Sequence, residues 1–325
     1  MNQQTLITAP IESELRQLVA LMRSSLSSDY DLLGQVLDHV RRQTGKMMRP
    51  ILALLMAKCH GGVTEKALHA AASLELLHTA SLVHDDVVDN SRERRGQPSV
   101  NAVFDNRVSV LTGDYLLSTS LLHGSLTGDV EIIRLISQLG QCLAEGELLQ
   151  LSNVSNEAIS EETYFQIIRK KTAVLFETCA QVGALSAGAS PERVEWARSI
   201  GEIIGIAFQV KDDIFDYTSS AAAIGKPVGN DMREGKLTLS VIHALLMADD
   251  DEMMALARKV KRLEATDDEI ARLVEFTKAK GGILYAEQYM QQQMERARLL
   301  LAECADEAVR TALSTYISFV VNREK

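Results

Sequence analysis

The chain has 325 residues, of which 46% are apolar and 24% charged, and its formal net charge is −10. This balance is typical of a globular protein of one or two domains. The acidic charge argues against a nucleic-acid surface, which needs clustered lysine and arginine. The four cysteines, Cys59, Cys142, Cys179 and Cys304, show no metal-binding spacing. We therefore expect reduced thiols, with neither a zinc site nor a disulfide framework.

The sequence contains no signal for membrane insertion or export. No apolar run approaches the roughly 18 residues that cross a bilayer. The N-terminus lacks the basic stretch and apolar stretch of a signal peptide. We expect a soluble, cytoplasmic protein without a transmembrane segment.

Helical periodicity runs through almost the whole chain, and strand signals are nearly absent. Ser160 before two glutamates, and Ser190 before Pro191, mark helix starts. The predicted helices span 11–26, 30–43, 50–60, 64–90, 107–127, 130–152, 160–188, 191–218, 237–248, 252–262, 267–280, 282–304 and 306–321. Because no linker or repeat divides the chain, we predict one all-α domain over residues 1–325, a bundle of about 13 helices.

Two helices carry aspartates in apolar surroundings. The stretch LVHDDVVDN, residues 82–90, contains Asp85, Asp86 and Asp89. On a helical wheel, Asp89 and His78 fall within about 40° of Asp85, so they share one face. The stretch QVKDDIFDY repeats the pattern further along the chain.

In the second stretch Gln209, Asp212, Asp213 and Asp216 follow helical spacing and form one stripe. If the two stripes faced one cleft, their carboxylates would repel, by about 4 kcal/mol for a pair about 4 Å apart at an effective dielectric constant of 20. Cations between them would remove this repulsion. Oxygen ligands on helices suit Mg²⁺, which binds carboxylates together with phosphate oxygens. The pattern therefore indicates Mg²⁺-bound diphosphate.

A single motif of this kind on a helix is most often a solvated acidic face. The acidic run 249–252 is an example, because it sits where a helix begins and favours the helix dipole. The two aspartate stretches differ because apolar residues flank them. Basic residues that could bind diphosphate occur in the same part of the sequence, although each alone is typical of a protein surface: Lys46, Arg49, Arg94, Arg95, Lys170, Lys171, Lys226 and Lys236.

The segments GKMMRP, ELLHTASLVHDDVVDNSRERRG, RKKTAVLFE, FQVKDDIFDY, GKPVGND and EGK resemble, in order and spacing, the trans-polyprenyl diphosphate synthase family. The resemblance extends from about residue 30 to the C-terminus. It implies a helical fold around a deep central cavity, a homodimer, and about three Mg²⁺ ions per active site. The implied substrates are isopentenyl diphosphate and an allylic diphosphate such as geranyl or farnesyl diphosphate. Product release implies peripheral membrane contact.

The resemblance also implies roles for individual residues. The expected metal ligands are Asp85, Asp86, Asp89, Asp212, Asp213 and Asp216. The expected contacts to the allylic diphosphate are Arg94, Lys171, Thr172, Gln209, Lys226 and Lys236. Isopentenyl diphosphate would meet Lys46, Arg49, His78 and Arg95. The residues expected to drive catalysis are Asp85, Asp86, Asp89, Lys171, Asp212 and Lys226. The family's usual Gly-Gly-Lys-Arg-x-Arg-Pro reads Thr-Gly-Lys-Met-Met-Arg-Pro here, which removes one charge and puts substrate affinity in question.

Product length should depend on the residues behind the first aspartates. Ala80 and Ser81 precede Asp85 by five and four residues, where short-chain members of the family tend to carry bulky aromatics. Small side chains would leave a channel towards Leu77 and Leu74, about 16 Å along the helix. Its expected floor is Leu121 and Leu122. We predict a product longer than C20, in the C30–C50 range of quinone side chains.

Other functions remain open. A short-chain farnesyl or geranylgeranyl diphosphate synthase would share every motif. A terpene cyclase shares the first motif but typically not the second. A non-catalytic partner subunit would be expected to lack aspartates, and a helical scaffold would have two solvated acidic faces. The C-terminal SFVVNREK is a candidate cover for the cavity, through Arg323 or Lys325.

Overall fold

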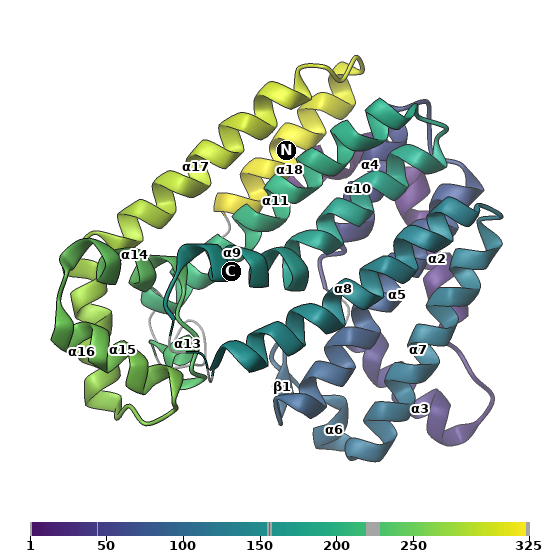
Figure 1. Ribbon diagram of the computed structural model, residues 1–325. Helices are drawn as coiled ribbons and strands as arrows, with labels where there is room; N and C mark the ends of the chain where they lie inside the picture. The colour runs from purple at the N-terminus through teal and green to yellow at the C-terminus, as the bar shows by residue number, and fades with distance from the viewer. Residues whose placement is uncertain (1, 44, 155, 157, 219–227, 323–325) are drawn as a thin grey trace. The chain divides into compact units, whose positions relative to one another are not determined.

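The computed structural model describes residues 2–43, 45–154, 156, 158–218 and 228–322. Its elements are α1 (Gln3–Thr8), η1 (Ala9–Ile11), α2 (Glu12–Ser25), α3 (Asp31–Arg42), α4 (Met48–Cys59), α5 (Glu65–Val88), β1 (Glu93–Arg94), β2 (Gln97–Pro98), α6 (Val100–Val103), α7 (Asn106–Leu126), α8 (Val130–Val154), α9 (Glu161–Ile168), η2 (Arg169–Ala173), α10 (Val174–Ser186), α11 (Pro191–Thr218), α13 (Asn230–Arg233), α14 (Leu239–Ala248), α15 (Asp251–Lys261), α16 (Asp267–Ala279), α17 (Gly282–Leu301) and α18 (Glu307–Asn322). Figure 1 shows these helices, and the predicted all-α class is confirmed.

The predicted helices are present with close boundaries, and two of the predicted regions differ. The short elements α1, η1 and α6 were not predicted. The helix predicted over 160–188 is interrupted by η2, a π-helical turn that carries Lys171 and Thr172. The loop predicted over 218–236 contains the short helix α13, while residues 219–227 lie outside the described chain. Within the described residues, no helix is both long and apolar enough to cross a membrane.

A two-stranded hairpin follows α5, which the sequence patterns did not predict. Strand β1 pairs antiparallel with β2, and Arg94 faces Gln97. Arg95 and Gly96 form the turn with φ angles of 54° and 72°, the conformation that a tight two-residue hairpin turn requires. The hairpin turns the chain back after the first aspartates.

Contacts divide the described chain into two compact units, each assembled from several separate stretches. The first comprises residues 1–140, 175–201 and 301–316, and the second comprises 141–174, 202–300 and 317–325. The division follows no composition boundary in the sequence, and the single domain stays a prediction.

In the first unit, α5 lies alongside α7 (Figure 1). Each of the two serines at the crossing, Ser73 and Ser120, donates its hydroxyl to the backbone carbonyl of the other, at 2.7 and 2.8 Å. Near the other end of α5, the ring of His84 occupies the space that a Cβ at Gly113 would take, with Nε2 only 2.1 Å away. A side chain at Gly113 would therefore displace the ring of His84 from this crossing.

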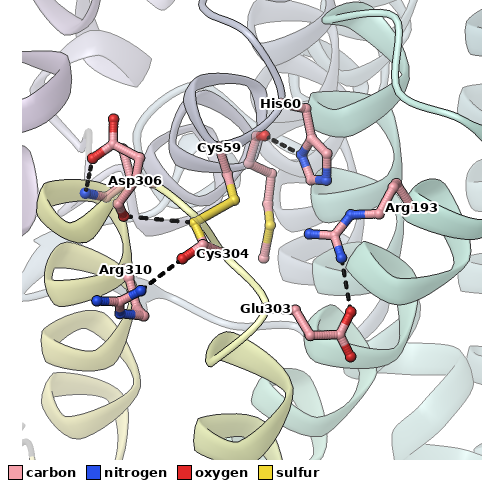
Figure 2. The surroundings of a disulfide bond; sticks show 9 residues. Cys59, His60, Arg193, Glu303, Cys304, Asp306 and Arg310 are labelled. Atoms are coloured by element: carbon pink, nitrogen blue, oxygen red, sulfur yellow. Dashed lines mark hydrogen bonds and ion pairs between the residues drawn. A yellow bond between two sulfur atoms is a disulfide. The ribbon is translucent and has the colours of Figure 1, made fainter.

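The first unit also contains a disulfide between Cys59, at the end of α4, and Cys304, between α17 and α18 (Figure 2). Their Cα atoms are 6.2 Å apart although 245 positions separate them in the sequence. The expectation of reduced thiols is wrong for this pair, because sequence spacing could not reveal that the two segments meet. Close by, Arg193 donates to Glu303 at 2.8 Å, and Arg310 to the carbonyl of Cys304 at 2.9 Å.

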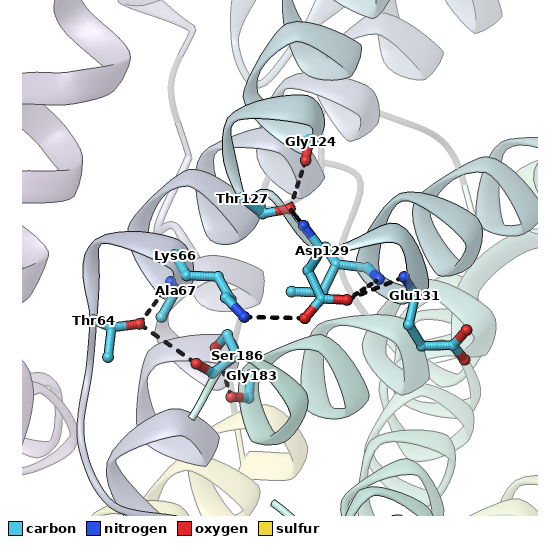
Figure 3. A network of polar contacts seen from close by, with 10 residues as sticks. Thr64, Lys66, Ala67, Gly124, Thr127, Asp129, Glu131, Gly183 and Ser186 are labelled. Carbon is cyan, nitrogen blue, oxygen red and sulfur yellow. Dashed lines mark hydrogen bonds and ion pairs between the residues drawn. The ribbon is translucent and has the colours of Figure 1, made fainter. Parts of the chain in front are cut away.

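A polar network joins three places in the first unit where helices begin or end (Figure 3). Thr64 caps α5 by accepting from the N–H of Ala67, and its hydroxyl donates to the carbonyl of Ser186, both at 3.4 Å. Lys66 binds the carboxylate of Asp129 at 3.0 Å. Because Asp129 also accepts from backbone N–H groups at the start of α8, the network fixes the start of α5 relative to the start of α8.

In the second unit, α14, α15 and α16 surround an apolar core that includes Val241, Leu256 and Leu273. Thr266 and Glu269 form a capping box at the start of α16, which pairs the exposed backbone N–H groups of that end. Tyr217, at the end of α11, belongs to the same core. The core therefore anchors the helix that carries the second aspartate group.

Candidate functional site

The first aspartate group lies at the C-terminal end of α5, in the first unit. Asp86 is buried, with 2% of its surface exposed, whereas Asp85 is half-buried and Asp89 is exposed. The Asp86 carboxylate accepts from Arg94 Nε at 3.0 Å and also from Arg94 Nη2. Asn101 donates to the Asp86 carbonyl at 3.1 Å. The hairpin therefore places the guanidinium of Arg94, an expected substrate contact, beside the carboxylate of Asp86.

The second aspartate group lies on α11, in the second unit. Asp213 is buried, and its two oxygens accept from the hydroxyl of Tyr164 at 2.6 Å and from Gln209 Nε2 at 2.8 Å. Thr172, on η2, donates in turn to Gln209 Oε1 at 2.7 Å. Asp212 is exposed. One hydrogen-bonded chain therefore links three of the expected site residues with a tyrosine that the sequence did not suggest.

The third aspartate of this group serves as a helix cap. Asp216 accepts from the backbone N–H groups of Asn230 and Asp231, at 2.9 and 3.2 Å, and so caps the start of α13. The left-handed backbone at Gly229, with φ of 79°, precedes that start. This cap brings Asp231 beside the aspartates of α11.

Acidic groups in the second unit raise one another's pKa. Burial, followed by the charges of Asp212 and Asp216, raises the pKa of Asp213 to about 7. Burial and the charges of Asp213 and Asp216 raise the pKa of Asp231 well above its usual value. Burial also raises the pKa of Asp216. Clustered carboxylates of this kind are a donor set that fits a hard cation such as Mg²⁺.

Among the described residues, no three His, Cys, Asp or Glu side chains converge closely enough to hold a metal ion by themselves. Mg²⁺ commonly takes only one or two carboxylates and completes its shell with water and phosphate oxygens. The carboxylates present therefore fit Mg²⁺ together with a diphosphate better than they fit a cage built from protein alone.

One cavity of the second unit brings together several expected site residues. Its lining includes Lys171, Thr172, Gln209, Asp213 and Lys236, together with Tyr164, Asp231 and Lys261. The ammonium of Lys171 binds Glu147 at 2.6 Å and Gln150 at 3.0 Å, and that of Lys236 binds Glu234. Lys226 lies outside the described residues.

A cavity of the first unit contains a second set of expected site residues. His78, Arg94 and Arg95 line it, opposite apolar side chains of α2 and α3. Burial, followed by the charges of Arg49, Arg95 and Arg94, lowers the pKa of His78 well below its usual value, so His78 is neutral at pH 7. Lys46 is exposed on the segment before α4 and is not part of this lining.

The position of Arg95 depends on a glycine in the segment before α4. Arg95 Nη1 donates to the Gln43 carbonyl at 2.8 Å. A Cβ at Gly45 would lie only 2.5 Å from the same nitrogen. The glycine of GKMMRP therefore lets the guanidinium lie across the backbone, and the positive φ of Arg95 in the hairpin turn directs it there.

Residues behind the first aspartates differ from one another in their surroundings. Ala80 is 3% exposed and packs in a core formed with residues of α3 and α7, about 140° from Asp85 around the helix. Ser81 is half-buried on the Asp85 face, and its hydroxyl donates to the His78 carbonyl at 2.9 Å. Leu77 and Leu74 are buried.

The expected floor of the channel is wrong for a single chain. Leu121 and Leu122 on α7 are 48% and 57% exposed, so within the described part of the chain they do not form a buried floor. Leu77, by contrast, approaches α8, where a Cβ at Gly140 would lie 3.9 Å from its Cδ1. The sequence could not reveal which face of α7 turns outward, because both faces of this helix carry leucines.

The sequence analysis missed several polar residues of these cavities. Tyr164 had no motif to mark it, whereas Glu75 and Asp231 stood inside the quoted segments ELLHT and GKPVGND without a role. A buried carboxylate within a motif otherwise rich in apolar residues was the available signal. Lys261, 4% exposed, donates to the Ala158 carbonyl at 2.8 Å and lies far from any motif.

Comparisons with known proteins identify the family of the chain. Residues 30–277 match the family model described as polyprenyl synthetase. The chain is 33% identical over 306 residues to octaprenyl diphosphate synthase of Escherichia coli (strain K12), which covers 94% of each protein.

Two solved structures are similar along nearly their whole length. The geranylgeranyl pyrophosphate synthase of Bacteroides thetaiotaomicron is 53% identical, with a TM-score of 0.87 and coverage of 99% of this chain and 100% of that one. A decaprenyl diphosphate synthase from Rhodobacter capsulatus is 34% identical, with a TM-score of 0.91 and coverage of 99% of both chains. On the family model, the relatives and the shared helical fold, the chain belongs to the polyprenyl synthetase family and is a prenyltransferase.

Proposed function

We propose that this prenyltransferase condenses an allylic diphosphate head-to-tail with isopentenyl diphosphate and extends the product beyond C20, into the C30–C50 range. The observation that carries the proposal is the cavity of the second unit, where Lys171, Thr172, Gln209 and Lys236 surround clustered carboxylates. Lysines and amides bind phosphate oxygens, and carboxylates attract the cation that accompanies them. A cavity with both kinds of group suits a diphosphate with its bound cation better than it suits a free diphosphate or a free cation.

Mg²⁺, bound with the substrate, would supply stabilisation of the charge that develops on the departing diphosphate. We propose that its ligands come from the six aspartates of the two motifs, Asp85, Asp86, Asp89, Asp212, Asp213 and Asp216. Three of them also accept hydrogen bonds from the protein: Asp86 from Arg94, Asp213 from Tyr164 and Gln209, and Asp216 from the start of α13. These contacts would hold the carboxylates in place, and about three ions would serve one active site.

The first unit supplies the isopentenyl diphosphate contacts in this proposal. Arg49, Arg95 and the neutral ring of His78 would bind its diphosphate, with Lys46 joining from the exposed segment before α4. Holding two reactants in place contributes up to roughly 7–11 kcal/mol to catalysis in favourable cases. Arg94 and Lys226, with the lysines of the second unit, would hold the allylic diphosphate, and the released diphosphate is the proposed proton acceptor.

The long-chain product is supported by the small residues behind Asp85. Ser81 lies on the same helix face as Asp85 and is half-buried, so it leaves room where an aromatic ring would not. The relative from Escherichia coli is named for an octaprenyl product. A C20 product is the second candidate, because the 53% identical structure is that of a geranylgeranyl pyrophosphate synthase.

A homodimer is supported by one face of α7. Val110, Leu111, Leu117, Leu121 and Leu122 are 37–67% exposed and recur at helical spacing along that face. Exposed apolar stripes mark contact surfaces, and a two-fold dimer pairs one such stripe with its copy. Light scattering should therefore give a dimer mass for the wild type and a monomer mass for Leu121→Glu, whereas a dimeric variant would place the interface elsewhere.

The test of the proposed reaction is incubation with Mg²⁺ and three substrate sets: farnesyl diphosphate alone, isopentenyl diphosphate alone, and both together. We expect prenyl product and released diphosphate only from the pair. Hydrocarbon from farnesyl diphosphate alone would indicate a terpene cyclase. No turnover with any set, despite binding, would indicate a non-catalytic partner subunit, and no binding would favour a scaffold.

A cytoplasmic location with peripheral membrane contact is part of the proposal, because a long prenyl product partitions into membranes. Disulfides are uncommon in a reducing cytoplasm. Alkylation of freshly lysed cells followed by mass spectrometry would show whether Cys59 and Cys304 are joined there.

A further inference from the structure

Glu75 is a buried carboxylate inside the cavity assigned to isopentenyl diphosphate. It lies on α5 three residues before His78, on the same helix face, and 6% of its surface is exposed. It lines the cavity together with His78, Arg94 and Arg95. A buried carboxylate is rarely retained without a partner of opposite charge. An acid in a cavity that binds an anion therefore needs an explanation.

The charges around Glu75 identify its partners. Burial raises the pKa of Glu75, and the charges of Arg49 and Arg95 oppose that rise. Arg94 has a carboxylate of its own, because Asp86 accepts from it at 3.0 Å. Glu75 is thus the acid placed to balance the two arginines that we assign to isopentenyl diphosphate.

These two arginines come from different elements. Arg49 is in the first turn of α4, with its guanidinium 5.0 Å from the centre of the Phe176 ring. Arg95 is in the turn of the hairpin and bonds to the Gln43 carbonyl. Arg95 lines the cavity with Glu75, and the charge of Arg49 also acts on Glu75. Two positive charges this close to one acid repel each other, and the carboxylate on α5 offsets that repulsion.

We propose that Glu75 is a positioning residue that sets Arg49 and Arg95 for the diphosphate of isopentenyl diphosphate without touching that substrate. The inference rests on the proposed function, since it takes this cavity as the isopentenyl diphosphate site. A positioning role and a purely structural role of Glu75 predict different results. Loss of a structural acid would weaken folding and the binding of both substrates, whereas loss of a positioning acid weakens the binding of only one substrate.

The experiment is calorimetric titration of the full-length protein with isopentenyl diphosphate alone, so that no turnover occurs. Glu75→Gln keeps the shape and removes the charge, and we expect its Kd to rise about tenfold or more. Binding of a non-reactive allylic diphosphate analogue with Mg²⁺ should stay within about twofold of wild type. Glu65→Gln, at the exposed start of the same helix, is the matched control and should bind both ligands as wild type does.

Each outcome decides the inference. Equal or tighter isopentenyl diphosphate binding by Glu75→Gln overturns it, as does equal weakening for both ligands. If Glu75→Gln does not fold, Glu75→Asp decides: about threefold weaker binding supports the inference, and unchanged binding overturns it. Failure of the wild type to bind isopentenyl diphosphate would overturn the proposed function itself and is seen before any variant is made.

Discussion

The two aspartate groups share one spacing, yet the protein treats their second aspartates differently. Asp86 on α5 is bound by the guanidinium of Arg94, a positive charge. Asp213 on α11 is bound by the hydroxyl of Tyr164 and the amide of Gln209, which are neutral. The second aspartate of the first group therefore has a positive partner, whereas that of the second group has neutral partners and acidic neighbours that raise its pKa. The same motif can thus pair one second aspartate with an arginine and leave the other among acids.

The largest effect should come from the aspartates that we assign to Mg²⁺ in each group. Asp85→Asn and Asp212→Asn should each lower kcat by about 10³-fold, because each removes charge that stabilises the departing diphosphate. Steady-state assays with saturating Mg²⁺ measure this. Asp249→Asn, on an exposed acidic turn, is the control. Full activity of either variant would remove that aspartate from the metal site.

Replacing Asp86 tests the counter-charge of the first group. Asp86→Asn should destabilise the protein by about 2 kcal/mol, because it leaves the partly buried Arg94 without its carboxylate. Chemical denaturation without Mg²⁺ measures the free energy of unfolding. An unchanged value would mean that the pair contributes nothing to the fold.

The matching change in the second group should act in the opposite direction. Asp213→Asn removes one of several repelling acids and should stabilise the Mg²⁺-free protein by about 1 kcal/mol at pH 8. The same denaturation experiment applies. Destabilisation equal to that of Asp86→Asn would mean that the two groups do not differ in the way described above.

A further effect is a dependence of stability on pH. The pKa of Asp213 is about 7 in the folded protein, above its unfolded value of about 3.9. The folded state therefore binds more protons between these values, and the free energy of unfolding should fall as pH rises from about 4 to 7. Asp213→Asn should flatten this slope, and Mg²⁺ with a bisphosphonate should do the same. A slope equal in variant and wild type would assign it to other groups.

Helix boundaries were predictable because periodicity and caps are local. Ser160 accepts from the N–H of Thr163 at 3.1 Å, as its place before an acidic first turn indicated. The hairpin at 93–98 was missed, although Arg95-Gly96 offered a turn signal, because the strands are only two residues long. The π-helical turn η2 was hidden because its residues fit an α-helical pattern equally well.

The contacts of the candidate site could not be predicted from the sequence. Spacing and the family resemblance marked its aspartates and basic residues, and the roles of these residues stay predictions. Asp86 meets Arg94 because the hairpin returns the chain to α5. Asp213 meets Tyr164 although 49 positions separate them in the sequence. The disulfide joins residues 245 positions apart, and no local pattern reports such a meeting.

The structure also changes which residue should test product length. Ala80 packs in the core with α3 and α7, so a phenylalanine there would overfill that core, at a cost of about 1–3 kcal/mol. Ser81 is half-buried on the Asp85 face and accepts a larger side chain with less disturbance. Ser81→Phe is therefore a better test of product length than Ala80→Phe.

The most direct test of the whole account is the length of the prenyl chain made from farnesyl diphosphate and isopentenyl diphosphate with Mg²⁺, measured by mass spectrometry for the wild type and Ser81→Phe side by side. We expect wild-type products beyond C20 and shorter products from the variant, with turnover retained. A wild-type product that stops at C15 or C20 would contradict the long-chain proposal. Identical product lengths in the two proteins would contradict the position of the channel behind the first aspartates.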